Sequence, residues 1–259
     1  MSGIGDLEKV CLKIADEIES RVSEERRRNF RQLGEEVDMG ADGTPTQHVD
    51  KVAEDIALLA ADGRMNVLSE EAGFIDYGME YTMVIDPVDG TRNAVHGIPF
   101  YCTSIAVGKK RLGDVEYSLV RNLLTGDTYT AERGKGAFLN GERIEVNRSR
   151  VEPIISLALG KSGNNRIFNY LDINNVNIRS MGAAALEMCL VASGSLSAYI
   201  QGNEYLRVTD FAAATLIVRE AGGEVFDAGG TPLDVGLNLE ERSSVLAVSC
   251  EDMLEGLIT

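Results

Sequence analysis

The chain has 259 residues, of which 41 are Asp or Glu and 25 are Lys or Arg, so its formal net charge is −16. Such a surface repels nucleic acids and anionic membranes, and it attracts divalent cations. No apolar run approaches the roughly 18 residues that cross a bilayer, and the N-terminus shows no basic segment followed by an apolar core. We therefore expect a cytoplasmic protein without a nucleic-acid or membrane partner.

Two amphipathic helices are predicted near the N-terminus. Apolar residues at spacings of three and four from Leu7 to Val22 predict one long helix. Residues 34–43 contain three glycines and several acids, and we expect a flexible loop there. The Thr-Pro-Thr segment at residues 44–46 then predicts the start of a second helix, which ends at Gly63.

Two short apolar strands come next, and each runs into acidic residues. Val67 and Leu68 precede Ser-Glu-Glu at residues 69–71. The stretch "MVIDPVDGTRN" (83–93) begins as a buried strand and turns polar at Asp86. Its Gly-Thr pair at residues 90–91 is typical of a turn that opens a helix.

The remaining elements divide the chain into two α/β halves. Short β-rich runs separated by Gly, Asn and Asp predict a mainly antiparallel meander over residues 104–146, closing the first half (1–150). The second half (151–259) alternates. Its strands are predicted at residues 154–160, 175–180, 196–200, 223–227 and 245–249, its helices at 182–194 and 209–221, and a short helix at the C-terminus.

The acids at the two strand ends point to a metal site. Taken singly, each fits a turn or a helix cap. In α/β sheets, however, ligand sites collect at strand ends, so Glu70, Asp86 and Asp89 converge if the two strands are neighbours. Crowded carboxylates repel one another unless they are protonated or bridged by a hard cation, and Mg²⁺ prefers oxygen ligands. The pattern therefore favours magnesium.

The Gly-Thr pair adds the features of a phosphate site. Free N–H groups at a helix start bind anions, and Gly90 lets a phosphate approach the backbone. A bound metal would lower the pKa of a water from about 15.7 toward neutrality. Two other motifs differ in spacing. The D-x-D-G-T phosphatases have one residue between their acids, where two separate Asp86 from Asp89, and an EF-hand needs ligands where Val88 and Gly97 stand.

Three segments resemble signatures of a known family. "SEEAG", "DPVDGTRNAVHGIP" and "VTDFAAATLIVREAGG" are similar to those of the inositol monophosphatase superfamily of lithium-sensitive, magnesium-dependent phosphatases. The loop "MGADGTPTQHVDKVAED" resembles that of its archaeal members. The resemblance implies an α/β fold of the αβαβα five-layer sandwich type and a homodimer. It also implies a phosphatase acting on fructose 1,6-bisphosphate, inositol 1-phosphate or both.

The resemblance further implies two to three Mg²⁺ ions per site. Glu70, Asp86 and the Val88 carbonyl would hold the first ion. Asp86, Asp89 and Asp210 would hold the second. A third, weaker ion would lie near Glu70, beneath the loop of residues 34–43 with its acids Asp38 and Asp42.

Catalytic and substrate roles follow from the same resemblance. Thr91, paired with Asp50, would orient and deprotonate the attacking water, and Glu70 would complete the catalytic set. Arg92 could reach a phosphate or only solvent, and Asn93 could contact a sugar hydroxyl or cap a turn. For Arg179 and Arg207, a surface salt bridge is an equal alternative to a substrate contact. The candidate substrate contacts are Gly90, Thr91, Arg92, Asn93, Arg179 and Arg207.

Three other functions stay open at this stage. One is a phosphatase of 3′-phosphoadenosine nucleotides with the same fold, although such enzymes usually have longer chains. Another is a non-catalytic regulatory binding protein, and the third is a sugar-binding α/β domain that holds calcium. The four acids and the Asp50–Thr91 pair favour catalysis, because a pure binding surface does not require them.

Overall fold

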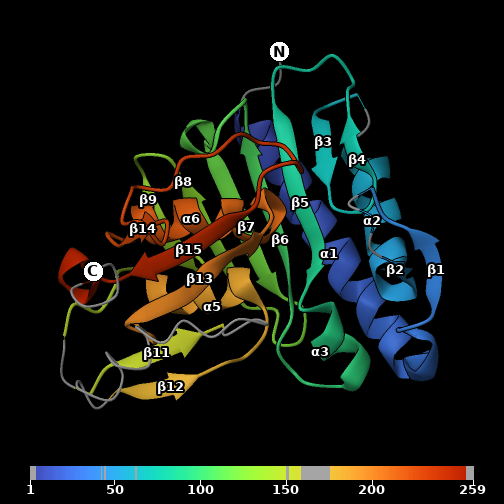
Figure 1. Ribbon diagram of the computed structural model, residues 1–259. Coiled ribbons are helices and arrows are strands. Elements are labelled where there is room, and N and C mark those ends of the chain that lie inside the picture. Colours follow the sequence, from blue (N-terminus) through green and yellow to red (C-terminus); the bar gives the residue numbers. More distant parts are fainter. Residues whose placement is uncertain are drawn as a thin grey trace.

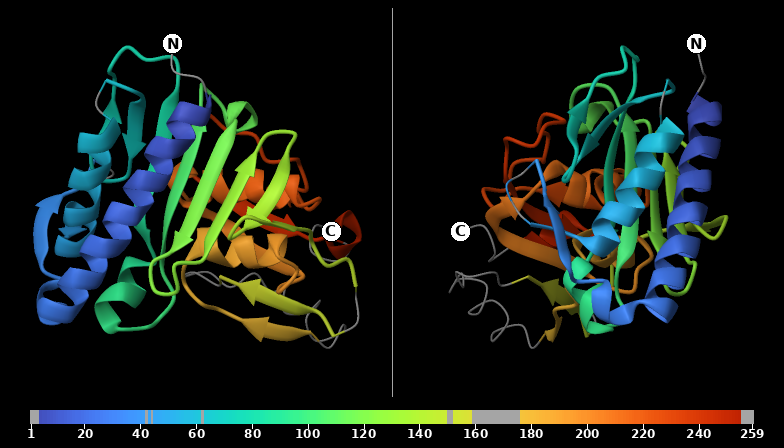
Figure 2. Two further views of the ribbon diagram at one scale, coloured as in Figure 1. Left: turned by 180° about the vertical axis from the view of Figure 1, so that it is seen from behind. Right: turned by 90° about the vertical axis from the view of Figure 1, so that its right-hand side faces the viewer.

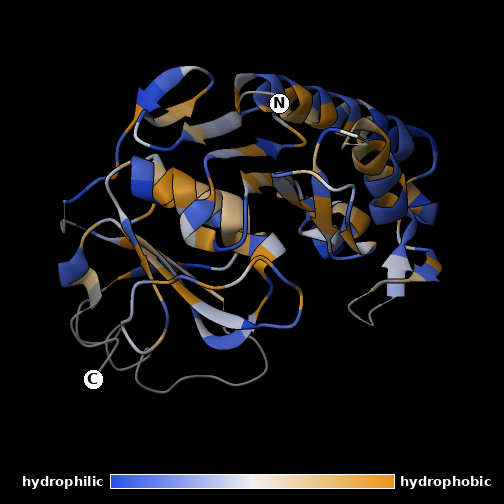
Figure 3. Ribbon diagram, turned by 90° about the horizontal axis from the view of Figure 1, so that it is seen from above, coloured by the Kyte–Doolittle hydropathy of each residue, from blue (hydrophilic) through white to orange (hydrophobic). Residues whose placement is uncertain are grey.

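The predicted N-terminal helix forms as α1 (Ile4–Arg28), and its buried residues, including Leu7, Cys11 and Ile14, repeat at the predicted spacing. The alternation of hydrophobic and hydrophilic residues along it is visible in Figure 3. The computed structural model describes residues 4–41, 43, 45–61, 63–149, 152–158 and 176–254. In it, α1 packs beside α2 (His48–Ala61), and both helices cover one face of a large sheet (Figure 2).

The first sheet has eight strands in the order β10-β9-β8-β7-β6-β5-β3-β4. Its neighbours are antiparallel, except that β3 and β5 run parallel. The run from β6 to β10 confirms the predicted meander. The strands are β3 (Asn66–Ser69), β4 (Gly73–Ile75), β5 (Thr82–Asp89), β6 (Cys102–Gly108), β7 (Tyr117–Asn122), β8 (Thr128–Glu132), β9 (Gly136–Leu139) and β10 (Glu142–Ile144).

The second sheet has five strands in the order β12-β11-β13-β15-β14. Two helices, α5 (Ala184–Ala192) and α6 (Val208–Glu220), lie between the sheets (Figure 1). Residues 208–218 of α6 are all buried, because this helix packs against strands of both sheets. The strands are β11 (Ile154–Leu157), β12 (Asn177–Arg179), β13 (Ala198–Leu206), β14 (Glu224–Phe226) and β15 (Ser243–Val248).

The buried apolar residues of the described part of the chain form three clusters. One lies under α1 and α2, a second surrounds α5 and α6, and a third covers the outer face of the second sheet, where Met253 of η3 (Glu251–Leu254) packs. The remaining 3₁₀ turns are η1 (Phe30–Gln32) and η2 (Leu112–Asp114). The predicted layered α/β class is confirmed. Within the described ranges, no helix has the length and apolar character needed to span a membrane.

The segment before α2 corrects the prediction. We expected a loop over residues 34–43 and a helix start at 44–46, but β1 (Glu36–Met39) pairs antiparallel with β2 (Pro45–Gln47). The second helix therefore begins at His48. All four β1 residues are exposed, so the strand leaves no alternation of buried and polar positions in the sequence.

The predicted end of the second strand at Asp86 is wrong, because β5 continues to Asp89. Asp86 pairs with Ser104 and Asp89 with Cys102, so β5 has one residue more than β6 in this interval. This is a β-bulge, a position where proline is tolerated in a sheet. Side chains three residues apart on a regular strand point to opposite faces. The extra residue lets Asp86 and Asp89 line one cavity.

The helix predicted after this strand forms as α3 (Thr91–His96). Gly90 precedes it with φ 90°. A Cβ on Gly90 would lie 3.1 Å from the Cβ of Ala183 and 3.2 Å from the Phe100 carbonyl oxygen. This position therefore requires glycine for both its backbone conformation and its close packing.

We predict that Gly90→Ala destabilises the fold by about 1–3 kcal/mol more than Gly134→Ala does, as expected for overpacking. Gly134 is a matched control because it has φ 74° but nothing within 4 Å of an added Cβ. It therefore reports the backbone cost alone. Denaturant unfolding would measure both losses, and equal losses would contradict the packing argument.

Candidate metal and phosphate site

Three carboxylates from separate elements meet at the end of the first sheet. In the parallel pair β3–β5, Ser69 lies opposite Ile85, so Glu70 and Asp86 follow at the same level. Asp210 reaches them from the first turn of α6. Ligand oxygens of Glu70, Asp86 and Asp210 all lie within 4.8 Å of one another. The neighbouring strands that the sequence argument required are therefore present.

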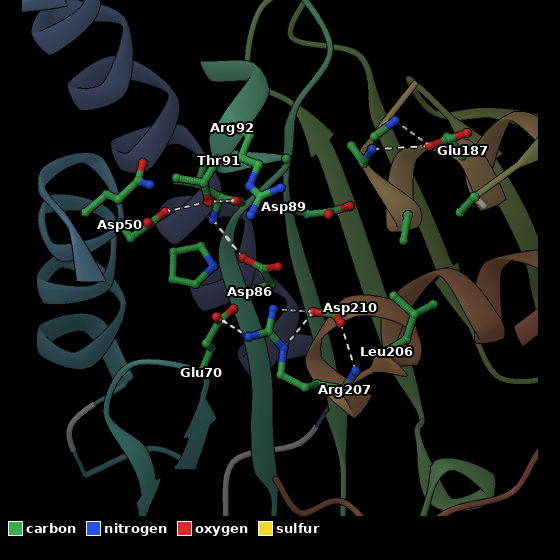
Figure 4. A pocket seen from close by; sticks show the side chains of 18 of the residues that line it. Asp50, Glu70, Asp86, Asp89, Thr91, Arg92, Glu187, Leu206, Arg207 and Asp210 are labelled. Atoms are coloured by element: carbon green, nitrogen blue, oxygen red, sulfur yellow. Dashed lines mark hydrogen bonds and ion pairs between the residues drawn. The ribbon is translucent and has the colours of Figure 1, made fainter. Parts of the chain in front are cut away.

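These acids line a cavity of about 460 Å³ that contains residues from both halves of the chain. Figure 4 shows the labelled side chains arranged around it. Its wall is formed by Pro45, Gln47, Asp50, Glu70, Glu71, Asp86, Pro87, Val88, Asp89, Gly90, Thr91, Arg92, Ala158, Gly182, Ala183, Ala184, Glu187, Tyr199, Gln201, Leu206, Arg207 and Asp210.

Arg207 lies between two of the acids. Its Nη1 forms an ion pair with Oε1 of Glu70, and its Nη2 and Nε are each 3.3 Å from Oδ1 of Asp210. The backbone N–H of Arg207 donates to Oδ2 of Asp210 over 2.8 Å. Both oxygens of Asp210 therefore contact the residue that precedes α6.

Asp50 and Thr91 form the pair that the resemblance implied. The Thr91 hydroxyl is 2.9 Å from Oδ1 of Asp50 and 2.9 Å from the Val88 carbonyl oxygen. Burial raises the pKa of Asp50 to about 8, and the charges of Glu71 and Glu70 add to the rise, while the hydrogen bond from Thr91 opposes it. With this pKa the Asp50 carboxyl group of the metal-free protein keeps its proton at neutral pH.

Asp89 connects the two halves of the chain. Its Oδ2 accepts a hydrogen bond of 2.7 Å from the N–H of Ala185, in the first turn of α5. Burial and the charge of Asp210 raise the pKa of Asp89 to about 7. Burial, together with Asp89, Glu70 and Asp210, also raises the pKa of Asp86. The site thus holds more negative charge than it can stabilise without cations.

The chemistry of this donor set fits a hard divalent cation. The three clustered side chains all offer carboxylate oxygens, the ligand type that Mg²⁺ prefers. The cationic side chain of Arg207 contacts two of these carboxylates, those of Glu70 and Asp210. The residues present therefore fit Mg²⁺.

Not every predicted residue points into the cavity. Asn93 is buried, and its Nδ2 donates to the carbonyls of Phe100 and Met181 at 2.7 Å each, which favours the structural alternative for this side chain. Arg179 is exposed on β12 and donates to the neighbouring Ile178 carbonyl.

Asp38 and Arg92 are both exposed in the structure. Asp38 is exposed on β1 and accepts from the N–H of Met39. Asp42 lies outside the described residues. Arg92 is exposed at the cavity wall.

The sequence argument missed Glu187. This buried side chain in α5 accepts hydrogen bonds from the N–H groups of Gly182 at 2.8 Å and Ala183 at 3.3 Å, and from the Ser156 hydroxyl. It thereby fixes a backbone turn that lines the cavity. A single acid within the apolar run "GAAALEMCLVASG" was the signal that could have identified it.

Comparison with known proteins assigns this fold and site to a family. Residues 7–258 match the model of the inositol monophosphatase family, and the chain belongs to it. A fructose-1,6-bisphosphatase/inositol-1-monophosphatase of Thermococcus kodakarensis is 38% identical over 254 residues, covering 96% of this chain and 95% of the relative. A solved structure from Pyrococcus horikoshii, described as similar to inositol-1 monophosphatase, superposes with a TM-score of 0.87 at 32% identity and covers 99% of this chain and 98% of that one.

Some relatives are longer than this chain. A bifunctional NADP phosphatase/NAD kinase of Methanococcus maripaludis is 37% identical over 96% of this chain, but the match covers only 48% of that protein. A similar protein of Methanocaldococcus jannaschii is 34% identical and is covered to 47%. The chain thus spans about half the length of these two relatives.

We predict that Asp50 contributes stability to the metal-free protein that is lost as pH rises from about 4 to about 8. The folded state keeps a proton on Asp50 to about pH 8, whereas an unfolded Asp loses it near pH 3.9. Between these values the folded state binds more protons, so the free energy of unfolding falls with rising pH.

Asp50→Asn should therefore flatten this slope in EDTA, measured by denaturant unfolding at pH 5, 6.5 and 8. The exposed Glu240→Gln change serves as a control. A slope for Asp50→Asn parallel to that of the wild type would contradict the assignment.

Proposed function

We propose that this chain is a magnesium-dependent phosphomonoesterase that hydrolyses sugar phosphates, namely fructose 1,6-bisphosphate, inositol 1-phosphate or both. One observation carries the proposal. The cluster of Glu70, Asp86 and Asp210 shares its cavity with the Asp50–Thr91 pair and with the start of α3. Membership of the inositol monophosphatase family supports it.

The proposed metal ligands are those inferred from the sequence. Glu70, Asp86 and the Val88 carbonyl would hold one Mg²⁺, and Asp86, Asp89 and Asp210 a second, with a weaker third near Glu70. When bound, Mg²⁺ supplies charge neutralisation and a water of lowered pKa. The homodimer and the cytoplasmic location remain predictions.

The Asp50–Thr91 pair would move the proton of the attacking water. The Thr91 hydroxyl accepts a proton from the water as it attacks phosphorus and passes its own proton to Asp50. The 2.9 Å contact already places the two side chains at hydrogen-bond distance. In the metal-free protein the pKa of Asp50 is about 8. Nearby Mg²⁺ would favour the ionised carboxylate, which is the form that accepts the proton. Glu70 completes the proposed catalytic set.

The first turn of α3 would bind the phosphate. The N–H groups at the start of a helix have no partner within the helix and attract anions. Gly90 and Thr91 supply these groups at the cavity wall, and the exposed guanidinium of Arg92 stands beside them. Arg207, which contacts Glu70 and Asp210, lines the same cavity.

A second candidate substrate is NADP. The bifunctional relatives of Methanococcus maripaludis and Methanocaldococcus jannaschii are described as NADP phosphatases, and they cover most of this chain. The reaction would be the same monoester hydrolysis at the 2′-phosphate. The cavity lining does not distinguish the two substrate classes by charge, because both carry the phosphate that the α3 turn would bind.

We predict phosphate release from fructose 1,6-bisphosphate and inositol 1-phosphate with Mg²⁺ and none with EDTA. Assays with NADP and 3′-phosphoadenosine 5′-phosphate run alongside. Release from NADP alone would replace the sugar phosphates with the second candidate, and release from the 3′-nucleotide alone would favour the alternative of the sequence analysis. No release from any substrate would overturn the proposed enzyme.

Thr91→Ala should slow hydrolysis by about 10²–10⁴-fold, the range expected when a proton-transfer group is lost. Mg²⁺ binding measured by calorimetry should remain nearly unchanged, because the Thr91 side chain is not a proposed ligand. Thr91→Ser keeps the hydroxyl and should retain most of the activity. Loss of Mg²⁺ binding in Thr91→Ala would assign the residue a structural role instead.

A further inference from the structure

The guanidinium of Arg207 contacts two of the three clustered carboxylates. Its Nη1 pairs with Glu70, while Nη2 and Nε lie 3.3 Å from Oδ1 of Asp210 (Figure 4). Its side chain is 20% exposed and that of Glu70 is 17% exposed, so these ion pairs are largely shielded from water. Charge-assisted hydrogen bonds in such surroundings are stronger than exposed ones.

A planar guanidinium suits this position. Its donors form a fixed fork that can contact two carboxylates at once, which a single ammonium cannot do in the same way. Glu70, Asp86 and Asp210 would otherwise repel one another at separations within 4.8 Å. Arg207 therefore supplies a positive charge that offsets the repulsion between these carboxylates.

The backbone lets this side chain leave without releasing Asp210. The N–H of Arg207 donates to Oδ2 of Asp210 over 2.8 Å, while the side chain contacts Oδ1. Rotation of the Arg207 side chain would remove its contacts with Oδ1 of Asp210 and Oε1 of Glu70. The backbone bond to Oδ2 of Asp210 and the 3.4 Å hydrogen bond from the Thr209 hydroxyl to Oδ1 would remain. Asp210 would thus stay in place at the start of α6.

We propose that Arg207 is a built-in competitor of the divalent metal. Its guanidinium bridges Glu70 and Asp210 in the metal-free site and is displaced when Mg²⁺ binds. This inference rests on the proposed metal site. It adds that binding is an exchange of one cation for another, so the wild-type protein binds Mg²⁺ more weakly than the same carboxylates would without the bridge.

Calorimetric titration of Mg²⁺ into EDTA-treated, dialysed protein tests this directly. Arg207→Gln should bind Mg²⁺ about tenfold more tightly than the wild type, which corresponds to about 1.4 kcal/mol. Arg64→Gln is the control, because it removes the same charge just beyond the C-terminal end of α2, whereas Asp50 lies in the first turn of that helix. The Mg²⁺ affinity of this variant should equal that of the wild type.

Arg207→Lys separates the bridge from the charge. It keeps the positive charge but not the fork, so we expect it also to bind Mg²⁺ more tightly than the wild type. An affinity equal to that of the wild type would show that a point charge accounts for the effect, and would overturn the bridge. This variant also carries the test if Arg207→Gln does not fold.

Thermal unfolding gives a second readout that does not depend on activity. In EDTA, Arg207→Gln should melt below the wild type, because the carboxylates lose their counter-charge. At saturating Mg²⁺ this deficit should vanish or reverse. An equal deficit in both conditions would indicate a merely structural residue and overturn the proposal.

The outcomes separate this inference from the proposed function. Equal Mg²⁺ affinities in the wild type and both Arg207 variants would overturn the competitor role and leave the metal site standing. No Mg²⁺ binding in any of the proteins would overturn the metal site, and the competitor role with it.

Discussion

The arrangement of this site depends on holding carboxylates close together in a buried place, against their mutual repulsion. The backbone does this by binding one oxygen of each of the three aspartates. Oδ1 of Asp86 accepts from the N–H of Val88, Oδ2 of Asp89 from Ala185, and Oδ2 of Asp210 from Arg207. These bonds partly offset the cost of removing the charges from water. The other oxygens face the shared cavity, and burial together with the neighbouring acids raises the pKa values of Asp86 and Asp89 in the absence of a metal.

Three structural features bring these acids together. The parallel β3–β5 pair sets Glu70 beside Asp86, and the bulge that contains Pro87 brings Asp89 to the same cavity. The third feature is α6, which packs between the two sheets and carries Asp210 in its first turn. Neither half of the chain contains the whole site, because the bond from Ala185 and the carboxylate of Asp210 come from the second half.

The sequence predicts this site well where the signal is local. The acids that follow apolar strands, the Gly-Thr turn and the buried face of α1 are all visible in short windows. The β5 bulge is not, because it exists only relative to the register of β6. Nor is the direction of Asn93, whose partner carbonyl on Met181 is 88 residues away. The exposed β1–β2 hairpin is local but could not be predicted either, because its pairing uses backbone groups and leaves no hydrophobic pattern in the sequence.

The Thr91 hydroxyl joins the metal-binding and proton-accepting parts of the site. It has one proton and two acceptors, Asp50 and the Val88 carbonyl, at 2.9 Å each. In the proposed metal-bound site the Val88 carbonyl would also be a ligand, and an oxygen whose electrons are drawn toward a cation is a poorer hydrogen-bond acceptor. The proton of Thr91 would then be directed to Asp50, and the hydroxyl lone pairs would be available to accept from a water. The short helix α3 begins at this threonine, so in the proposed mechanism the same residue would hold the phosphate-binding turn and direct the proton.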